Sequence, residues 1–108
     1  MAESFHGIAV YEVKSDGCLN GTWTDDHVDT KKEIYNDIAK KRGGNEQDCI
    51  EGTYDCAWIE HSGNIEKGVL VIKKAGSIYD FFWQVTDNSV IYKGIGIKTG
   101  NIISVTYW

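Results

Sequence analysis

The segment Asp25–Asp29 ("DDHVD") is a dense group of potential metal ligands. Asp25, Asp26, His27 and Asp29 offer carboxylate oxygens and one imidazole, a combination that can bind a divalent cation. The spacing does not match the calcium loop of an EF-hand, and no second group of ligands is evident in the sequence. We therefore interpret the segment as a solvated loop that leads into the next element, and we predict no metal site.

Nucleophilic catalysis would require a nucleophile, a base and an orienting group that meet in space. The candidates are scattered along the chain: Cys18, Cys49, Cys56, His6, His27 and His61. Cys49 and Cys56 are too far apart on one extended strand to form a disulfide, whereas Cys18 could pair with either. We expect partly buried free thiols, no catalytic residues and no cofactor.

A glycine-rich stretch, Gly94–Asn101 ("GIGIKTGN"), superficially suggests a phosphate-binding loop. It lacks the G-x-x-x-x-G-K-[ST] pattern, and no helix follows to offer its N-terminus to a phosphate. We interpret these glycines as strand residues that precede a turn at Thr99–Asn101.

Aromatic residues are the more informative group, because Tyr and Trp inside a barrel can stack on a sugar ring or an apolar ligand. Aromatic side chains make up 12% of the chain. The predicted barrel lining is Trp23, Tyr54, Trp58, Tyr79 and Trp83. Strand alternation puts Trp108, Tyr92 and Phe82 off the core face, so these three form the predicted binding surface.

The chain of 108 residues has the length of one domain, which we assign to residues 1–108. Its net charge of −5 provides no basic surface for nucleic acid. No apolar run is long enough to span a bilayer, and residues 1–10 do not resemble a signal peptide. The odd number of cysteines favours a reducing compartment, so we expect a cytoplasmic protein, or a secreted one if a leader has been removed.

Alternating apolar and polar residues indicate seven strands separated by turns rich in Gly, Asn, Asp and Ser. Odd positions of Ile78–Val85 and even positions of Ile50–Trp58 are predicted to face the core. The other predicted inward residues are Ala9, Tyr11, Val13, Leu19, Ile103, Val105 and Tyr107. Ile91, Ile95 and Ile97 share one face of their strand, while Val69–Ile72 is apolar on both faces and leaves its inward set open.

Residues 30–42 break this pattern. Thr30–Glu33 has the spacing of a capping box, Ile34, Tyr35, Ile38 and Ala39 form a short apolar stripe, and cations precede Gly43. We predict a helix of about three turns here. The alternative is that Lys32–Asp37 is an eighth strand, because Ile34 is β-branched and Tyr35 favours strands.

Glycines near strand starts, at Gly21, Gly52, Gly68 and Gly94, suggest bends in a sheet that curls toward closure. The predicted fold is mainly β, an antiparallel up-and-down meander of seven or eight strands that forms a small barrel or a curled half-barrel. If the sheet stays open, a second copy of the chain could pair with its edge to form a homodimer.

Three segments together resemble a family: "GTYD" (Gly52–Asp55), the run Gly68–Val85, and "GIGIKTGNIISVTYW" (Gly94–Trp108). They are similar to a bacterial β-module whose members are loosely labelled fibronectin-binding proteins. The segment "GIAVYEVKSDGCLNGTWT" (Gly7–Thr24) resembles another part of that pattern, although here it precedes the other segments. The resemblance implies a small antiparallel barrel with avidin-like hairpins and without an agreed activity.

The sequence therefore predicts a non-enzymatic binding module that recognises a protein or glycan partner. One alternative is a small-molecule carrier with a calycin-like cavity inside the barrel. Another is an acidic inhibitor or immunity protein that covers a basic surface of its target.

Overall fold

Eight strands account for nearly all the regular structure in the computed structural model, which describes residues 6–26, 31–42, 50–60, 62–85 and 90–108. Their bounds are β1 Gly7–Val13, β2 Leu19–Asp25, β3 Tyr35–Lys41, β4 Gly52–Ile59, β5 Ile65–Ala75, β6 Ile78–Gln84, β7 Val90–Thr99 and β8 Ile102–Tyr107. None of the described segments forms a helix long and apolar enough to cross a bilayer.

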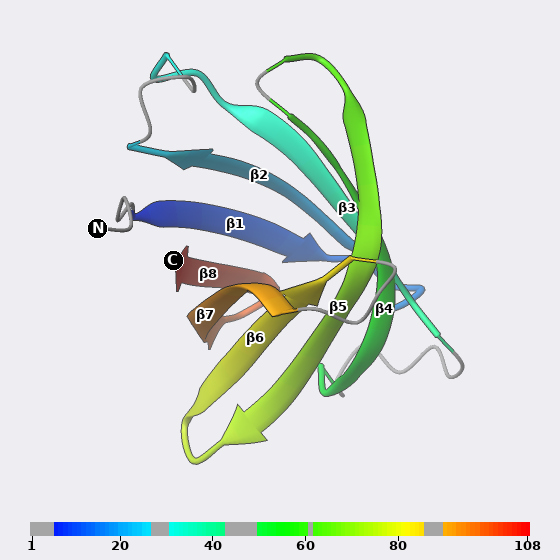
Figure 1. The fold of residues 1–108 in the computed structure, drawn as a ribbon. Helices are drawn as coiled ribbons and strands as arrows, with labels where there is room; N and C mark the ends of the chain where they lie inside the picture. Colours follow the sequence, from blue (N-terminus) through cyan, green and yellow to red (C-terminus); the bar gives the residue numbers. More distant parts are fainter. Residues whose placement is uncertain (1–5, 27–30, 43–49, 61, 86–89) are drawn as a thin grey trace.

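The strands form a closed antiparallel barrel in which each strand pairs with its neighbours in sequence (Figure 1). Closure is made by β1, which pairs with β2 on one side and with β8 on the other, so that Gly7 lies opposite Tyr107. The predicted meander is confirmed. The described strands leave no open sheet edge, and an open edge is the condition under which a second copy could pair with the barrel as a homodimer.

The core lies inside the barrel and follows the predicted alternation on most strands. Phe81 and Trp83 of β6 are buried, and so are Ile103, Val105 and Tyr107 of β8. In β4 the even positions Tyr54, Cys56 and Trp58 point inward. On β5, where the sequence left the choice open, Leu70 and Ile72 are buried while Val69 and Val71 lie on the outer face.

The helix predicted over residues 30–42 is wrong, because the chain forms β3 there. Lys31 and Lys32 both have φ of 57°, a left-handed conformation that a right-handed helix cannot contain. From Tyr35 onward, odd positions point inward and even positions outward. The hydrogen bonds of β3 to β2 and to β4 complete the barrel wall, so tertiary pairing outweighs the helical spacing of the apolar residues.

The alternation correctly groups Ile91, Ile95 and Ile97 of β7, but the face that they share is the outer one, where they are 40%, 38% and 59% exposed. Gly94 and Gly96 point inward instead. A Cβ added at Gly96 would lie 2.7 Å from the ring of Phe81, so this strand carries glycine where aromatic rings of β6 fill the barrel.

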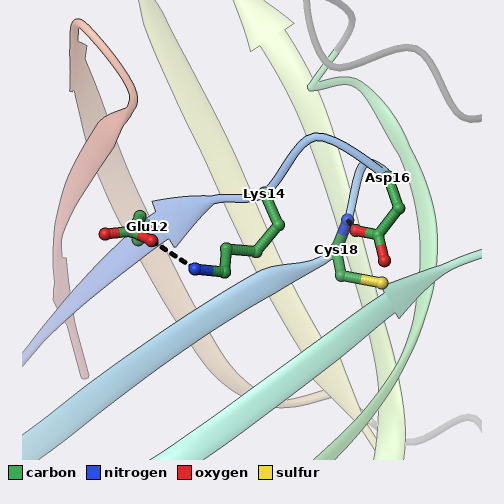
Figure 2. A network of polar contacts seen from close by, with 4 residues as sticks. All are labelled: Glu12, Lys14, Asp16 and Cys18. Atoms are coloured by element: carbon green, nitrogen blue, oxygen red, sulfur yellow. Dashed lines mark hydrogen bonds and ion pairs between the residues drawn. The ribbon is translucent and has the colours of Figure 1, made fainter.

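The turn between β1 and β2 shows why these hairpins need no proline. Asp16 Oδ1 accepts a hydrogen bond of 2.9 Å from the backbone N–H of Cys18, and Gly17 takes the left-handed conformation that the turn requires, with φ of 86°. On the adjoining strand end, Lys14 donates to Glu12 at 2.6 Å (Figure 2). These polar contacts lie at the end of the barrel opposite the chain termini.

Candidate functional site

A small cavity lies inside the terminal end of the barrel, the end at which β1 begins and β8 ends. Its volume is about 40 Å³, which is room for roughly one or two water molecules, and it opens to solvent. Side chains from seven strands reach it, because they occupy inward positions near the same end of each strand. The lining residues are Ala9, Tyr11, Trp23, Asp37, Trp58, Trp83, Tyr92 and Tyr107.

Asp37 is the one charged side chain buried among the described residues, with only 4% of it exposed. It lies on β3 between Gly21 of β2 and Trp58 of β4. The Tyr11 hydroxyl from β1 donates a short hydrogen bond to Asp37 Oδ2. The other oxygen, Oδ1, is buried and accepts no hydrogen bond from any residue that the structure describes.

Burial raises the pKa of Asp37 to about 6, and the hydrogen bond from Tyr11 lowers it only in part. The carboxyl group is therefore mostly ionised at neutral pH, inside an apolar environment. Burial, together with the negative charge of Asp37, raises the pKa of Tyr11 well above its ordinary value, so this tyrosine stays a neutral donor. An ionised carboxylate with one unpaired oxygen is costly to bury unless a positive charge or a donor approaches it.

Aromatic rings form the wall around this carboxylate. The Trp83 and Tyr107 ring centroids lie 5.7 Å apart at 59°, and those of Tyr92 and Tyr107 lie 5.9 Å apart in an edge-to-face arrangement. Such contacts between aromatic rings fix the ring orientations in the cavity wall. Trp23, on β2, contributes an indole whose buried Nε1–H has no hydrogen-bond partner within the described part of the chain.

The mouth of the cavity is acidic. The side chain of Glu60, just beyond β4, accepts a hydrogen bond of 2.9 Å from the Trp58 indole. After burial, the negative charges of Glu60, Asp25 and Glu66 raise the pKa of Tyr92. Acidic side chains therefore lie close to Trp58 and Tyr92 in the cavity wall, in addition to Asp37 inside it.

The structure brings together three of the five predicted lining residues, Trp23, Trp58 and Trp83. Tyr54 lies deeper in the core, where its hydroxyl donates to the backbone oxygen of Ile50 at 2.8 Å. Tyr79 is half-buried and packs against the core without lining the cavity.

The three residues predicted to form an outer binding surface do not stay together. Trp108 is 48% exposed on the outer face, and its backbone pairs with that of Lys93. Phe82 is half-buried on the outer face, opposite Val71 and Lys93. Tyr92, contrary to the predicted alternation, lies inside and lines the cavity, because β7 carries glycine rather than isoleucine on its inner face.

Sequence reasoning missed Asp37 because residues 30–42 were read as a helix, in which this aspartate falls on no particular face. Read as a strand, Tyr35, Asp37 and Ala39 share the inward face, and a carboxylate between two core positions would have been noticeable. Tyr11 was placed correctly in the core, but its hydroxyl was given no partner.

The described thiols and carboxylates suggest no further reactive centre. Burial raises the pKa of Cys56 to about 12, and burial together with Asp16 raises the pKa of Cys18. Both described cysteines are free. Within the described ranges, no three His, Cys, Asp or Glu side chains gather as a metal site requires. His27 and Asp29 of the acidic segment, and Cys49, lie outside those ranges.

The cavity offers groups for non-covalent contacts with a ligand: one buried hydrogen-bond acceptor, one buried donor and aromatic rings, with an opening to solvent. Comparison of the chain with protein-family models, with curated proteins and with solved structures finds no significant match in any of the three. The resemblance to the bacterial β-module stays a prediction.

Proposed function

We propose that this protein is a non-enzymatic binding protein that recognises a small molecule inside the terminal end of its barrel. One observation carries the proposal: in a solvent-open aromatic cavity, one oxygen of the buried Asp37 carboxylate accepts no hydrogen bond from the part of the chain that the structure describes. A carboxylate in this position lowers stability, and burial of an unpaired polar group is uncommon in folded proteins. A ligand that pairs with it would offset that cost.

The geometry favours a small ligand, or one small part of a larger ligand. A cavity of about 40 Å³ is small beside the roughly 150 Å³ that holds one benzene ring. Only a small part of a larger ligand therefore fits inside the cavity, and the remainder of the ligand extends through the mouth.

The four tryptophans provide an internal test. Trp23, Trp58 and Trp83 line the cavity, whereas Trp108 lies on the outer face. We expect titration with small water-soluble amines and alcohols to shift the indole N–H resonances of the first three in ¹⁵N–¹H NMR spectra and to leave that of Trp108 in place.

A cavity-filling variant serves as the control. Ala9 lines the cavity on β1, and Ala9→Val reduces its volume, while Ala57→Val adds the same atoms on the outer face of β4. Ala9→Val should abolish the shifts and Ala57→Val should preserve them. If no probe in the panel shifts the three cavity indoles of the wild type, the proposal is wrong.

A second candidate function, recognition of a protein partner, has its own observation on the outer face of β7, β8 and β1. Ile95 and Ile8 flank Thr106, and Ile97 and Val10 flank Ser104, so exposed apolar side chains form two adjacent rows. Exposed apolar patches of this kind often mark interaction sites. Binding there would shift the Trp108 resonance in the same experiment and leave the cavity indoles unchanged.

A further inference from the structure

The cavity has the chemistry of a site for a positively charged ligand. Among the described lining residues, Asp37 is the one carboxylic acid, it lies among aromatic rings, and none of the others is a lysine, arginine or histidine. Aromatic faces attract cations through their quadrupole, and the attraction grows when the site excludes water. The aromatic wall and the carboxylate of Asp37 therefore both favour a ligand with a positive charge.

The size and the hydrogen-bonding needs of the site narrow the class further. Asp37 Oδ1 requires a donor, which a quaternary ammonium ion does not have. About 40 Å³ accommodates roughly two non-hydrogen atoms at the packing of a benzene ring in its roughly 150 Å³ cavity. The terminal –CH₂–NH₃⁺ of an alkylamine has that size and carries three donors.

Acidic residues near the mouth of the cavity also favour a positively charged ligand. Glu60, Asp25 and Glu66 all lie close enough to raise the pKa of Tyr92 at the mouth. Acidic residues at the opening attract cations and repel anions before either reaches the interior. Lys31, Lys32 and His6 line a separate open depression on the β1 and β2 side, together with Asp25 and Asp26, and none of these residues lines the cavity itself.

We propose that the barrel binds a primary alkylammonium ion, with its –NH₃⁺ group bonded to Asp37 and enclosed by Trp58, Trp83 and Tyr107, and with its alkyl chain leaving through the mouth. This inference rests on the proposed function and specifies its ligand class.

The binding test uses n-butylammonium and its neutral counterpart, 1-butanol, with the full chain and isothermal titration calorimetry. We expect n-butylammonium to bind at least about tenfold more tightly than 1-butanol, which corresponds to one charge-assisted hydrogen bond. Butyltrimethylammonium, which keeps the charge but lacks the donor, should bind more weakly than n-butylammonium.

Asp37→Asn is the matched variant, because it keeps an acceptor for Tyr11 and removes the charge. It should reduce n-butylammonium affinity at least about tenfold and leave the affinity for 1-butanol nearly unchanged. Glu60→Gln on the rim should reduce the affinity for the amine only a few-fold. Circular dichroism of each variant confirms that the fold is retained.

The affinity should also depend on pH in one direction. Asp37 must be ionised to hold the ammonium group, so affinity should fall about tenfold from neutral pH to about pH 5, since the pKa of the unliganded acid is about 6. The groups that face Asp37 are Tyr11 on β1, Cys56 on β4 and Tyr107 on β8, and the pKa of each is raised. The rim carries Asp25, Glu60 and Glu66, so a pH dependence that persists in Asp37→Asn would place the effect there and contradict the assignment.

The outcomes separate the two proposals. If 1-butanol and n-butylammonium bind with equal affinity and Asp37→Asn has no effect, the barrel binds small molecules but the ammonium assignment is overturned. If neither probe shifts the cavity indoles, both proposals fail. Tight binding of n-butylammonium that is lost in Asp37→Asn supports both.

Discussion

At the scale of single residues, the most unusual feature is a carboxylate that the fold buries at a cost. Asp37 is 4% exposed and bonded to Tyr11 through only one of its oxygens. Buried acids of this kind commonly occur where a protein binds or reacts, because folding alone would favour an apolar side chain. This cost lowers the free energy of unfolding, and the pKa of Asp37 sets the direction in which it changes with pH.

The folded state raises the pKa of Asp37 from 3.8 to about 6, so the folded protein holds this proton more tightly than the unfolded chain does. The free energy of unfolding therefore falls as the pH rises through this window, by about 3 kcal/mol at most. In Asp37→Asn this loss is absent. We expect the stability of the variant relative to the wild type to grow by about 2–3 kcal/mol from about pH 4 to about pH 7, measured by urea denaturation without added ligand.

Asp55 supplies the control for this prediction. It is exposed, and its hydrogen bond with Arg42, at 2.7 Å, lowers its pKa. The stabilisation from a lowered pKa is present at higher pH and is lost as the pH falls, so Asp55→Asn should show a trend of opposite sign. A stability difference for Asp37→Asn that does not vary with pH would contradict the burial argument.

At the scale of strands, the barrel interior is shaped by pairing a bulky aromatic ring with glycine on a neighbouring strand. A Cβ placed at Gly7 would lie 2.1 Å from the ring of Tyr107, and one at Gly21 would lie 2.5 Å from the ring of Tyr11. Of the four glycines predicted as bends, Gly21, Gly68 and Gly94 therefore also lie against aromatic rings, whereas Gly52 faces the side chain of Lys41. The aromatic wall of the cavity depends on the glycines that lie against rings.

Gly68 of β5 offers the sharpest test of this arrangement, because its nearest neighbour is backbone. A Cβ there would lie 2.3 Å from the carbonyl oxygen of Gln84 and 3.3 Å from the ring of Trp58. We expect Gly68→Ala to lower the free energy of unfolding by about 1–3 kcal/mol, because a well-packed strand pair must separate to admit the methyl group.

Ser104→Ala, on the exposed outer face of β8, is the matched substitution and should change stability by less than about 0.5 kcal/mol. Equal effects of the two substitutions in thermal or chemical unfolding would show that close packing at Gly68 is not limiting.

At the scale of the whole molecule, closure joins the two ends of the chain. Gly7 pairs with Tyr107 across β1 and β8, and the Tyr107 hydroxyl donates to the backbone oxygen of Thr24 on β2 at 3.1 Å. The same tyrosine forms part of the cavity wall, so barrel closure and the candidate site share one side chain. The last two residues have separable roles.

Tyr107 is 7% exposed, whereas Trp108 is 48% exposed and holds β7 through its backbone. We expect Tyr107→Ala to cost about 3–5 kcal/mol, because it removes a large buried ring at the closing seam. Trp108→Ala should cost less than about 1 kcal/mol. Urea denaturation measures both, and a larger cost for Trp108→Ala would show that its indole, rather than its backbone, secures the barrel.

The sequence alone determined the class of fold, the hairpin order and most of the core. Side chains of a strand alternate between its two faces with a period of two. The inward face of a run such as Ile78–Gln84 can therefore be predicted without the rest of the chain. The glycine turns at Gly17, Gly76 and Gly100 are equally local, since each needs only a left-handed backbone conformation.

Only the tertiary structure decided β3, the inner face of β7 and, through them, the candidate site. The apolar residues of 30–42 have a spacing that is compatible with a helix. The chain forms strand β3 instead, because β2 and β4 both require a partner strand. On β7 the isoleucines would be the natural inward choice, yet the rings of Phe81 and Trp83 already occupy that space. Asp37 and Tyr92 line the same cavity only because these long-range pairings form. A local sequence pattern therefore could not predict the cavity.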